Sequence, residues 1–385
     1  MNVLYITHIS SFFTGANRSL YHMLVGLKSK GVKPIVLLSP YADMTLKVEL
    51  DKIGVQSYII EYYMPLLPNN DSFRDKLLYL PKILRSKFRN LLARRKISKI
   101  VQAESIDIIH TNVGPLLLGY EVANKLNIPH VWHLREFQDL DFNMKTWYTK
   151  KGFLSMLNHE NNQQIAISRA IYEHFHLKPP STVIYNGIMK SSAARYNSSK
   201  SDYFLYVGHL SENKGIQVLL QAFSIFCQNN KSHNLLIAGD STLPSYKLSL
   251  IDFLNEKGIG DRVSFLGHRN DVDQLMQSAT ALIVPSLNEA FGRITAEAMF
   301  NGCLVIGKNT GGTKEIIDLI GTGLLYDSVE ELADLMLNLT KVGIENYSDE
   351  LVSAMNKAKI KFSEESNAES VHRLYLELLK NRDDN

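Results

Sequence analysis

Two glutamates, Glu289 and Glu297, are the residues whose type and spacing point most directly to chemistry. The apolar run 281–284 precedes them and is stopped by Pro285, a pattern typical of a buried parallel strand that ends in a turn. From Arg293 the apolar spacing becomes helical. Glu289 is therefore expected at the carboxyl end of a strand, where open parallel sheets bind their ligands.

The spacing of the two carboxylates limits what they can bind. It corresponds to roughly 12 Å along a helix, so the pair cannot hold one metal ion, and it suits two contacts on an elongated ligand. Between them, the helix start near Phe291 and Gly292 favours a phosphate group. A nucleotide sugar would need such an acid at each end of its diphosphate. The structural alternative is that Glu289 caps the helix and Glu297 is a solvated side chain.

The segment from Glu289 to Ala298 resembles the E-x7-E motif of the retaining enzymes in glycosyltransferase family 4. The flanking residues 285–286 and 311–315 are similar to that family as well. The resemblance implies that the first glutamate contacts the donor sugar and the second contacts the nucleotide ribose. It also implies that three intervening residues line the donor site: Ala290, Phe291 and Gly292.

A second stretch resembles the family's diphosphate-binding segment, which has Gly-Arg-Leu, three residues and Lys-Gly. Gly208 and Lys214 match this pattern, whereas position 209 is His209 in place of the arginine. The resemblance implies that Lys214 and His209 hold the diphosphate, although a histidine is only partly cationic near neutral pH. It also places the nucleotide base near Gly267 and His268. The alternative for Lys214 is a surface lysine before a helix.

The first half of the chain resembles the family more loosely. Gly15 and Ala16 follow the first predicted strand and correspond to the family's Gly-Gly-Ala-Glu loop, which approaches the donor phosphates. In this chain Thr14 replaces the first glycine and Asn17 replaces the glutamate. Taken alone, one glycine in a turn is ordinary structure.

His133 lies near the end of another predicted strand, where a histidine is commonly a hydrogen-bonded structural residue. The family has a histidine at about this position that faces the donor sugar and the acceptor, so the resemblance makes His133 a site candidate. His110 is a weaker candidate on a neighbouring strand. Residues 183–188 are also similar to the family, with Met189 where the family usually has an aspartate.

The charge of the chain is uneven. Its net charge is +3, but the segment from Ser72 to Lys99 contains ten basic residues and only one acidic residue, Asp75. The basic residues are Arg74, Lys76, Lys82, Arg85, Lys87, Arg89, Arg94, Arg95, Lys96 and Lys99. Apolar residues interleave with them at helical spacing, and Pro81 predicts a start or a break of that helix.

This basic segment has three interpretations. It is a solvated helix packed on the domain core, or a membrane-surface helix attracted to anionic head groups. Nucleic acid is the third interpretation, and it is set aside because no recognition module accompanies the charge.

Composition supports a globular protein of two domains, because 385 residues exceed one ordinary core and 45% of them are hydrophobic. Cys227 and Cys303 have no metal-like or redox spacing, which predicts reduced thiols in the cytoplasm. The N-terminus is typical of a strand rather than of a signal peptide. No run reaches the ~18 apolar residues of a membrane span, so we expect a cytoplasmic protein, peripheral at most on the inner face of the cell membrane.

Alternating strands and helices in both halves predict two doubly wound α/β domains with a cleft between them. The resemblance makes this the GT-B fold. The predicted first domain comprises residues 1–190 and 366–385, because the final helix is expected to cross back onto it. Residues 191–201 are the predicted linker and residues 202–365 the nucleotide-sugar-binding domain.

Two Asp-x-Asp matches, at 139–141 and 271–273, resemble the manganese motif of the other large glycosyltransferase fold. Asp271 fits a helix cap better, and Asp139 falls in a predicted loop. We therefore expect neither a metal site nor a cofactor, with the nucleotide sugar as substrate.

The implied reaction transfers a sugar, with retained anomeric configuration, from a nucleotide diphosphate to a hydroxyl of a lipid-linked glycan. The donor is expected to be a UDP-sugar first and a GDP-sugar next, and the role is bacterial surface polysaccharide synthesis of the capsule or O-antigen type. The cations and the helix start would stabilise the leaving diphosphate without a metal. The expected catalytic residues are Glu289, His133 and Lys214.

Other functions are weighed against this one. A nucleotide-sugar epimerase of the same fold would need an acid/base set that the sequence does not show. A non-catalytic partner subunit is favoured by His209 and opposed by the intact Glu289, Lys214 and Glu297. A dehydrogenase is disfavoured because no Gly-x-Gly-x-x-Gly follows the first strand. A soluble or protein acceptor stays open.

Overall fold

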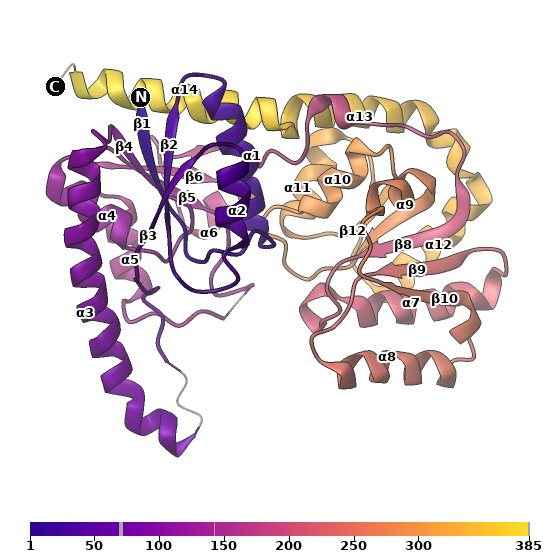
Figure 1. Cartoon of the computed structure of the whole chain (residues 1–385). Coiled ribbons are helices and arrows are strands. Elements are labelled where there is room, and N and C mark those ends of the chain that lie inside the picture. Colours follow the sequence, from indigo (N-terminus) through magenta and orange to yellow (C-terminus); the bar gives the residue numbers. More distant parts are fainter. Residues whose placement is uncertain (69–71, 142, 384–385) are drawn as a thin grey trace. The chain divides into compact units, whose positions relative to one another are not determined.

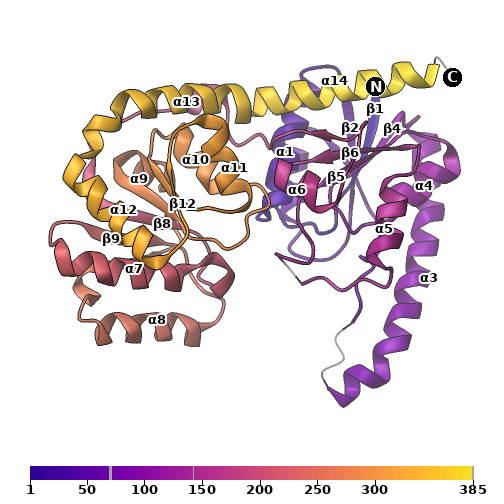
Figure 2. The same ribbon diagram turned by 180° about the vertical axis from the view of Figure 1, so that it is seen from behind.

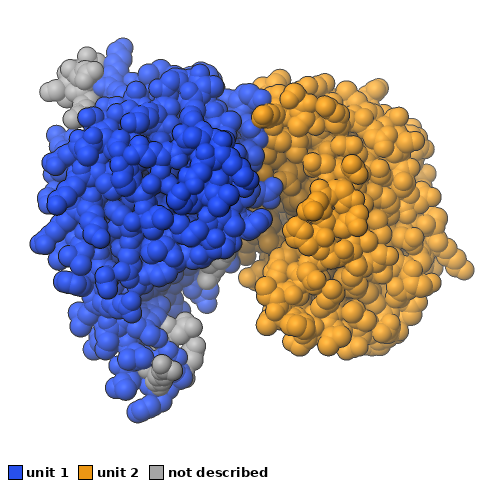
Figure 3. Space-filling view, in the orientation of Figure 1, with its two compact units in different colours: residues 1–187, 364–385 blue, residues 188–363 orange. Residues whose placement is uncertain are grey.

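The computed structural model of the chain describes residues 1–68, 72–141 and 143–383. Contacts divide the chain into two compact units, coloured separately in Figure 3. Unit 1 comprises residues 1–187 and 364–385, and unit 2 comprises residues 188–363. The stretch expected to be a linker, 191–201, lies in unit 2, where it holds the short 3-10 helix η1 (Ser191–Ala193) and the first residue of a strand.

The described residues of unit 1 form one sheet of seven parallel strands in the order β3-β2-β1-β4-β5-β6-β7 (Figure 1). The strands are β1 (Asn2–Ile6), β2 (Lys33–Leu38), β3 (Gln56–Ile59), β4 (Ile108–Thr111), β5 (His130–Leu134), β6 (Asn162–Ala166) and β7 (Thr182–Val183). The helices are α1 (Gly15–Lys28), α2 (Thr45–Lys52), α3 (Phe73–Ala103), α4 (Leu118–Leu126), α5 (Lys150–Leu157), α6 (Arg169–His174) and α14 (Glu364–Asp383).

Helices cover both faces of this sheet, because successive side chains of a strand point to opposite faces. Val3 and Tyr5 of β1 pack in a core with α1, α2 and α14. Leu4 and Ile6 pack in a second core with the C-terminal half of α3 and with α4. Both faces are therefore buried, as a parallel sheet requires.

The described residues of unit 2 form a parallel sheet of six strands in the order β10-β9-β8-β11-β12-β13. The strands are β8 (Ser201–Val207), β9 (Asn234–Ala238), β10 (Val263–Gly267), β11 (Ala279–Val284), β12 (Val305–Lys308) and β13 (Leu324–Tyr326). The helices are α7 (Ile216–Asn229), α8 (Pro244–Glu256), α9 (Val272–Ser278), α10 (Arg293–Phe300), α11 (Gly311–Ile320), α12 (Val329–Val342) and α13 (Ser348–Phe362). The short 3-10 helices are η2 (Glu212–Lys214), η3 (Gly260–Arg262) and η4 (Ile344–Tyr347).

Here α7, α8 and α12 share one core on one face of the sheet, while α9, α10 and α11 pack against the strands from the other face (Figure 2). The strand order is 3-2-1-4-5-6 when counted within the unit, which is the order of doubly wound nucleotide-binding sheets. The prediction of two doubly wound α/β domains is confirmed. In such a sheet the ligand site is expected where the order reverses, between β8 and β11.

The basic segment is one continuous helix, α3, so the expectation that Pro81 starts or breaks it is wrong. The helix begins at its N-cap Ser72, whose side chain accepts from the Asp75 N–H. Pro81 is exposed, so the carbonyl of Leu77, which loses its intrahelical partner, can be hydrated. The N-terminal half of α3 extends away from the other elements of unit 1 (Figures 1 and 2).

The two halves of α3 differ in burial. Ala93, Ile97 and Val101 of the C-terminal half lie in the core. The N-terminal half presents a run of exposed apolar side chains at helical spacing, which we call the apolar stripe: Phe73, Leu77, Leu80, Leu84, Phe88 and Leu91. None of the described helices is long and apolar enough to cross a membrane.

The first helix, α1, begins at Gly15, so the segment that resembles the family's loop lies in the helix. Thr14 caps it, because the Thr14 hydroxyl accepts from the Asn17 N–H at 3.3 Å. Gly15 and Ala16 thus lie in the first helical turn and not in a loop before it.

The final helix, α14, packs on α1 within unit 1, at a contact where Gly26 of α1 faces Ala368 of α14. A Cβ added at Gly26 would lie 2.5 Å from the Ala368 Cβ, which is closer than two carbons can pack. The glycine therefore lets α14 approach.

We predict that Gly26→Ala destabilises the protein, by about 1–3 kcal/mol of unfolding free energy, because overpacking outweighs the helix propensity of alanine. Gly15→Ala is the matched control in the same helix, since its added Cβ meets no atom within 4 Å. Urea unfolding of both variants measures the effect. A Gly26→Ala protein as stable as Gly15→Ala would contradict this account of the helix contact.

Candidate active site

The loops after β8 and β11 meet where the strand order of unit 2 reverses. Gly215 has φ +68°, and a Cβ on it would collide with the carbonyl oxygen of Pro285. The Leu287 N–H donates to the carbonyl of Asn213 at 3.1 Å. Only a glycine permits this backbone-to-backbone contact, which places the end of the first loop beside the start of the second.

This contact brings together two of the predicted site residues. The Nζ of Lys214 lies 2.6 Å from the Oε1 of Glu289. The Lys214 side chain is 38% exposed and that of Glu289 is 16% exposed, so the pair is open to a ligand from the lysine side. Lys214 and Glu289 are therefore partners, as a shared site would require.

The loop that carries Glu289 is also held against the start of α11. The Gly312 N–H donates to the Glu289 carbonyl at 2.7 Å, and a Cβ on Gly311 would lie 2.7 Å from that same oxygen. Gly292, with φ +86°, is the N-cap residue of α10. In the described part of the chain neither helix start has a side-chain cap, so two positive helix ends lie beside this loop.

Glu297 lies on α10 and forms an ion pair with Arg293, one helical turn earlier. The Nε of Arg293 is 2.8 Å from the Oε1 of Glu297, and its Nη2 donates to the carbonyl of Ile188 at 3.1 Å. Arg293 is thus a further candidate for this site that the family motifs do not contain. The i, i+4 spacing of opposite charges was the signal that could have identified it.

The other predicted donor residues lie at the carboxyl ends of β8 and β10. His209 is exposed, and its carbonyl accepts from the Tyr206 hydroxyl at 2.9 Å. The Gly208 N–H donates to Ala238, which ties this turn to β9. Gly267 ends β10, and His268 after it is exposed.

The aspartates that begin the two Asp-x-Asp matches both have side-chain partners within the protein. Asp271 occupies the N-cap position of α9 but makes no capping bond, because its carboxylate binds the guanidinium of Arg269 at 2.5 and 2.8 Å. The expectation that the Asp271 side chain caps this helix is therefore wrong, although the residue stands at the N-cap position. Asp139 pairs with His174 at 2.9 Å. Across the residues that the structure describes, no three His, Cys, Asp or Glu side chains gather as metal ligands would.

In unit 1, the two candidate histidines belong to one buried chain of hydrogen bonds. His110 of β4 binds the Tyr375 hydroxyl of α14 through Nδ1 at 2.6 Å and the Nδ1 of His133 through Nε2 at 3.2 Å. Tyr375 also contacts the hydroxyl of Tyr5 at 3.0 Å. The neighbouring guanidinium of Arg135 lies 3.3 Å from the same His133 Nδ1 and also binds Asn186.

These contacts assign the proton of His133. Burial, and next the charge of Arg135, hold the pKa of His133 well below its usual value, so the ring is neutral. Arg135 can only donate, so Nδ1 of His133 is the acceptor and Nε2 carries the hydrogen. This Nε2 is buried and has no hydrogen-bond partner among the described residues. His133 therefore presents a buried N–H donor that a ligand oxygen could satisfy.

Gly15 and Ala16 lie in the first turn of α1, which Thr14 caps. Asn17, which replaces the family's glutamate, is buried and donates to the carbonyls of Ile9 and Ser11 at 2.8 Å each. It holds the loop after β1 in place and does not face solvent. The Ala16 carbonyl accepts from Asn112 at 3.3 Å.

A buried carboxyl group, which the sequence did not single out, follows β5. Glu136 accepts from the Gly114 N–H at 2.9 Å. Burial, with a smaller contribution from the charge of Asp141, raises its pKa from 4.5 to about 7. Glu136 thus changes charge in the physiological range.

We predict that Glu136→Gln changes the pH dependence of stability. The folded protein holds the Glu136 proton more tightly than the unfolded chain does, because the pKa of Glu136 is raised on folding. The resulting contribution to the free energy of unfolding is complete below the ordinary glutamate pKa and is lost as the pH rises through about 7. The variant should match the native protein near pH 4 and exceed its unfolding free energy near pH 8 by up to about 3 kcal/mol. Thermal melts across this range measure the difference. The exposed Glu160→Gln serves as control, and an equal pH slope in all three proteins would refute the assignment.

Comparison with known proteins agrees with the motifs. Residues 13–190 match the family model described as Glycosyltransferase Family 4, and residues 190–361 match that described as Glycosyl transferases group 1. The chain is 29% identical over 304 residues to an uncharacterized glycosyltransferase of Methanocaldococcus jannaschii, a match that covers 76% of this chain and 82% of that protein.

Two further proteins are similar to this chain. D-inositol 3-phosphate glycosyltransferase of Corynebacterium jeikeium is 32% identical over 183 residues, which cover 45% of this chain and 43% of that protein. The crystal structure of Anabaena HepE in complex with UDP superposes with a TM-score of 0.77 at 20% identity, and covers 97% of this chain and 99% of that one. This similarity shows a shared fold.

The two family matches together span nearly the whole chain, and they meet at residue 190, close to the junction of the two units. The two doubly wound sheets agree with this assignment. The chain belongs to family 4 of the glycosyltransferases and has their GT-B fold.

Proposed function

We propose that this glycosyltransferase moves a sugar from a UDP-sugar to a hydroxyl of a lipid-linked glycan, with retention and without a metal. The observation that carries the proposal is the Lys214–Glu289 pair at the switch point of unit 2. It combines a cation for the diphosphate with an acid for the sugar hydroxyls. The UDP bound by HepE of the same fold supports uridine as the base.

Charge stabilisation of the leaving diphosphate comes from this chain's own groups in the proposal. Lys214, His209 and the starts of α10 and α11 supply positive charge where a diphosphate would lie. Glu289 holds the Lys214 ammonium in position before the donor arrives. Such an arrangement takes the place of a metal ion, and it applies equally to UDP and GDP.

In the proposal, the anomeric configuration is retained because the acceptor hydroxyl attacks the sugar from the same face that the diphosphate leaves. Both carboxylates of the motif are engaged by cations, Glu289 by Lys214 and Glu297 by Arg293. Neither is therefore assigned as a nucleophile. The departing phosphate oxygen takes the proton of the acceptor hydroxyl, Glu289 holds sugar hydroxyls, and Glu297 holds the ribose.

His133 contributes a neutral hydrogen-bond donor in this scheme. Its Nε2–H is buried and lacks a protein acceptor in the described structure, so a sugar or phosphate oxygen would accept its hydrogen bond. The chain of hydrogen bonds through His110 and Tyr375 fixes the orientation of the ring.

The acceptor is assigned to a lipid because of the exposed half of α3. The apolar stripe runs beside cations of the basic segment, which is the composition of helices that lie in a membrane interface. The protein would then be cytoplasmic and attached peripherally to the inner face of the membrane, in surface polysaccharide synthesis. D-inositol 3-phosphate, named for one relative, is a small phosphate-bearing acceptor and the alternative to a lipid.

We expect UDP-glucose to bind with EDTA present, as measured by calorimetry. Glu297→Gln should weaken the donor Kd about tenfold or more, because a charged acceptor of the ribose hydroxyls is lost. Glu289→Gln should bind the donor and lower the transfer rate roughly 100-fold or more.

Glu330→Gln, an exposed acid of α12, provides the matched control and should leave the titration unchanged. Titrations with GDP-glucose and ADP-glucose show which nucleotide base the protein prefers. If none of the donors binds, the transferase proposal fails and a non-catalytic partner subunit replaces it.

We predict that the protein floats with phosphatidylcholine vesicles that contain phosphatidylglycerol, and less so with pure phosphatidylcholine. Leu80→Glu combined with Leu84→Glu should reduce the bound fraction about tenfold, because two charges enter the apolar stripe.

Leu248→Glu on α8 of unit 2 is the control, since Leu248 is a similarly exposed leucine. Equal flotation of the α3 variant and the control would rule out this helix as the membrane contact.

A further inference from the structure

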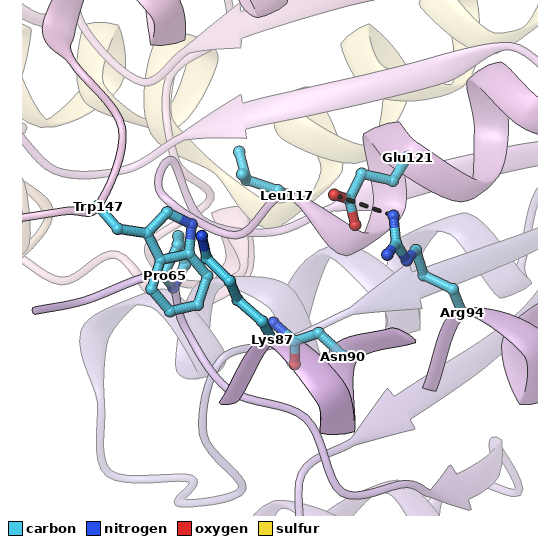
Figure 4. A pocket seen from close by; sticks show the side chains of 7 residues that line it. All are labelled: Pro65, Lys87, Asn90, Arg94, Leu117, Glu121 and Trp147. Carbon is cyan, nitrogen blue, oxygen red and sulfur yellow. Dashed lines mark ion pairs between the residues drawn. The ribbon is translucent and has the colours of Figure 1, made fainter. Parts of the chain in front are cut away.

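A pocket of about 200 Å³ lies in unit 1, and none of its lining residues belongs to the family motifs (Figure 4). Its lining residues are Pro65, Lys87, Asn90, Arg94, Leu117, Glu121 and Trp147. We propose that this pocket binds the phosphate-bearing sugar of the acceptor. The inference rests on the proposed function and names the part of the acceptor that the enzyme recognises.

The position of the pocket in the fold favours a ligand. Pro65, Leu117 and Trp147 come from the segments that follow β3, β4 and β5, so the pocket opens at the carboxyl edge of the sheet. The helices α3 and α4 supply the remaining side chains. Open parallel sheets bind ligands along this edge.

The wall of the pocket is built by backbone hydrogen bonds. The Trp147 N–H donates to the Pro65 carbonyl at 3.1 Å, and the Leu67 N–H donates to the Lys145 carbonyl at 2.7 Å. Asn90 binds both the N–H and the carbonyl of Tyr63, at 2.8 and 2.9 Å. These bonds hold the tryptophan and the asparagine in fixed positions, so the pocket is formed before a ligand enters.

The chemistry of the lining suits a sugar that carries a phosphate. Figure 4 shows Trp147, Pro65 and Lys87 on one side of the pocket and the Arg94–Glu121 pair on the other. The Lys87 Nζ lies 5.7 Å from the centroid of the Trp147 ring, and Arg94 lies 3.3 Å from Glu121. An indole face packs on the apolar side of a pyranose ring, a carboxylate accepts from sugar hydroxyls, and two cations bind a phosphate.

The volume favours one ring over a long chain. Sites for drug-sized ligands have volumes of ~300–1,000 Å³, so a pocket of about 200 Å³ accommodates a single sugar with its charged group. The remainder of the acceptor would lie outside.

The apolar stripe explains where a lipid would lie. Leu84 and Leu91 are three and four residues from Lys87, so they are its neighbours on the surface of α3. They are 66% and 40% exposed. The mouth of the pocket is therefore continuous with the surface that we assign to the membrane. The same sugar phosphate, free in solution, is the other source of this chemistry.

The test uses the full-length protein and tryptophan fluorescence, because Trp132 is fully buried in the core and Trp147 lines the pocket. Titration with α-D-glucose 1-phosphate should give saturable quenching that D-glucose does not. Lys87→Gln should weaken it about tenfold or more, since a charge-assisted contact is lost, and Trp147→Phe should abolish the signal. Lys125→Gln, an exposed lysine of α4 outside the pocket, should behave as the native protein.

A second arm measures flotation with phosphatidylcholine vesicles that do or do not contain polyprenyl-phosphate glucose. Binding of the free sugar phosphate supports the pocket with a soluble source, and binding of the vesicle-borne sugar alone supports it with a lipid source. The proposal is overturned if neither probe binds, or if Lys87→Gln and Lys125→Gln behave alike. Calorimetry with UDP-glucose on the same samples reports unit 2 separately, so loss of the proposed transferase function is distinguished from failure of the pocket.

Discussion

The backbone contact between the loops that follow β8 and β11 is the constraint on which the proposed donor site depends. A side chain at Gly215 would collide with the Pro285 carbonyl, so the approach of these loops requires glycine at this position. The approach places Lys214 against Glu289, and the bond from Gly312 to the Glu289 carbonyl adds the start of α11 to the same point. Three segments that are distant in sequence are thus held together by contacts of the protein itself.

The charges of this site are neutralised in pairs. Each motif glutamate has a cation within 3 Å, and the lysine of one pair is the more exposed partner. The diphosphate of the proposed donor would therefore reach Lys214 without first separating a fully buried ion pair, whose disruption would be costly. In unit 1 the corresponding polar cluster is uncharged at its histidines, because burial beside Arg135 keeps His110 and His133 neutral. The Lys214–Glu289 pair is thus ionic, whereas the two histidines of unit 1 take part as neutral hydrogen-bonding groups.

The helix α3 is buried in the core of unit 1 at one end and exposed at the other. Its C-terminal half is held in the core by Ala93, Ile97 and Val101, and that anchorage supports an N-terminal half with little packing of its own. The pocket lies at the transition between the halves, beside Trp147. An amphipathic helix with one half buried can present its other half as a surface while the domain remains folded, because the core contacts stabilise it.

The sequence alone determined the alternating strands and helices, the paired glutamates and the lysine motif, because these depend on local periodicity and short spacings. It could not show that Lys214 pairs with Glu289, that Tyr375 of the last helix binds His110, or that Glu136 is buried enough to titrate near pH 7. Those partners are 75 and 265 residues apart. Local pattern also misjudged Pro81, since a proline is tolerated within a helix where solvent can hydrate the freed carbonyl. Partner choice, burial and desolvation are properties of the packed chain, so only the tertiary structure decided them.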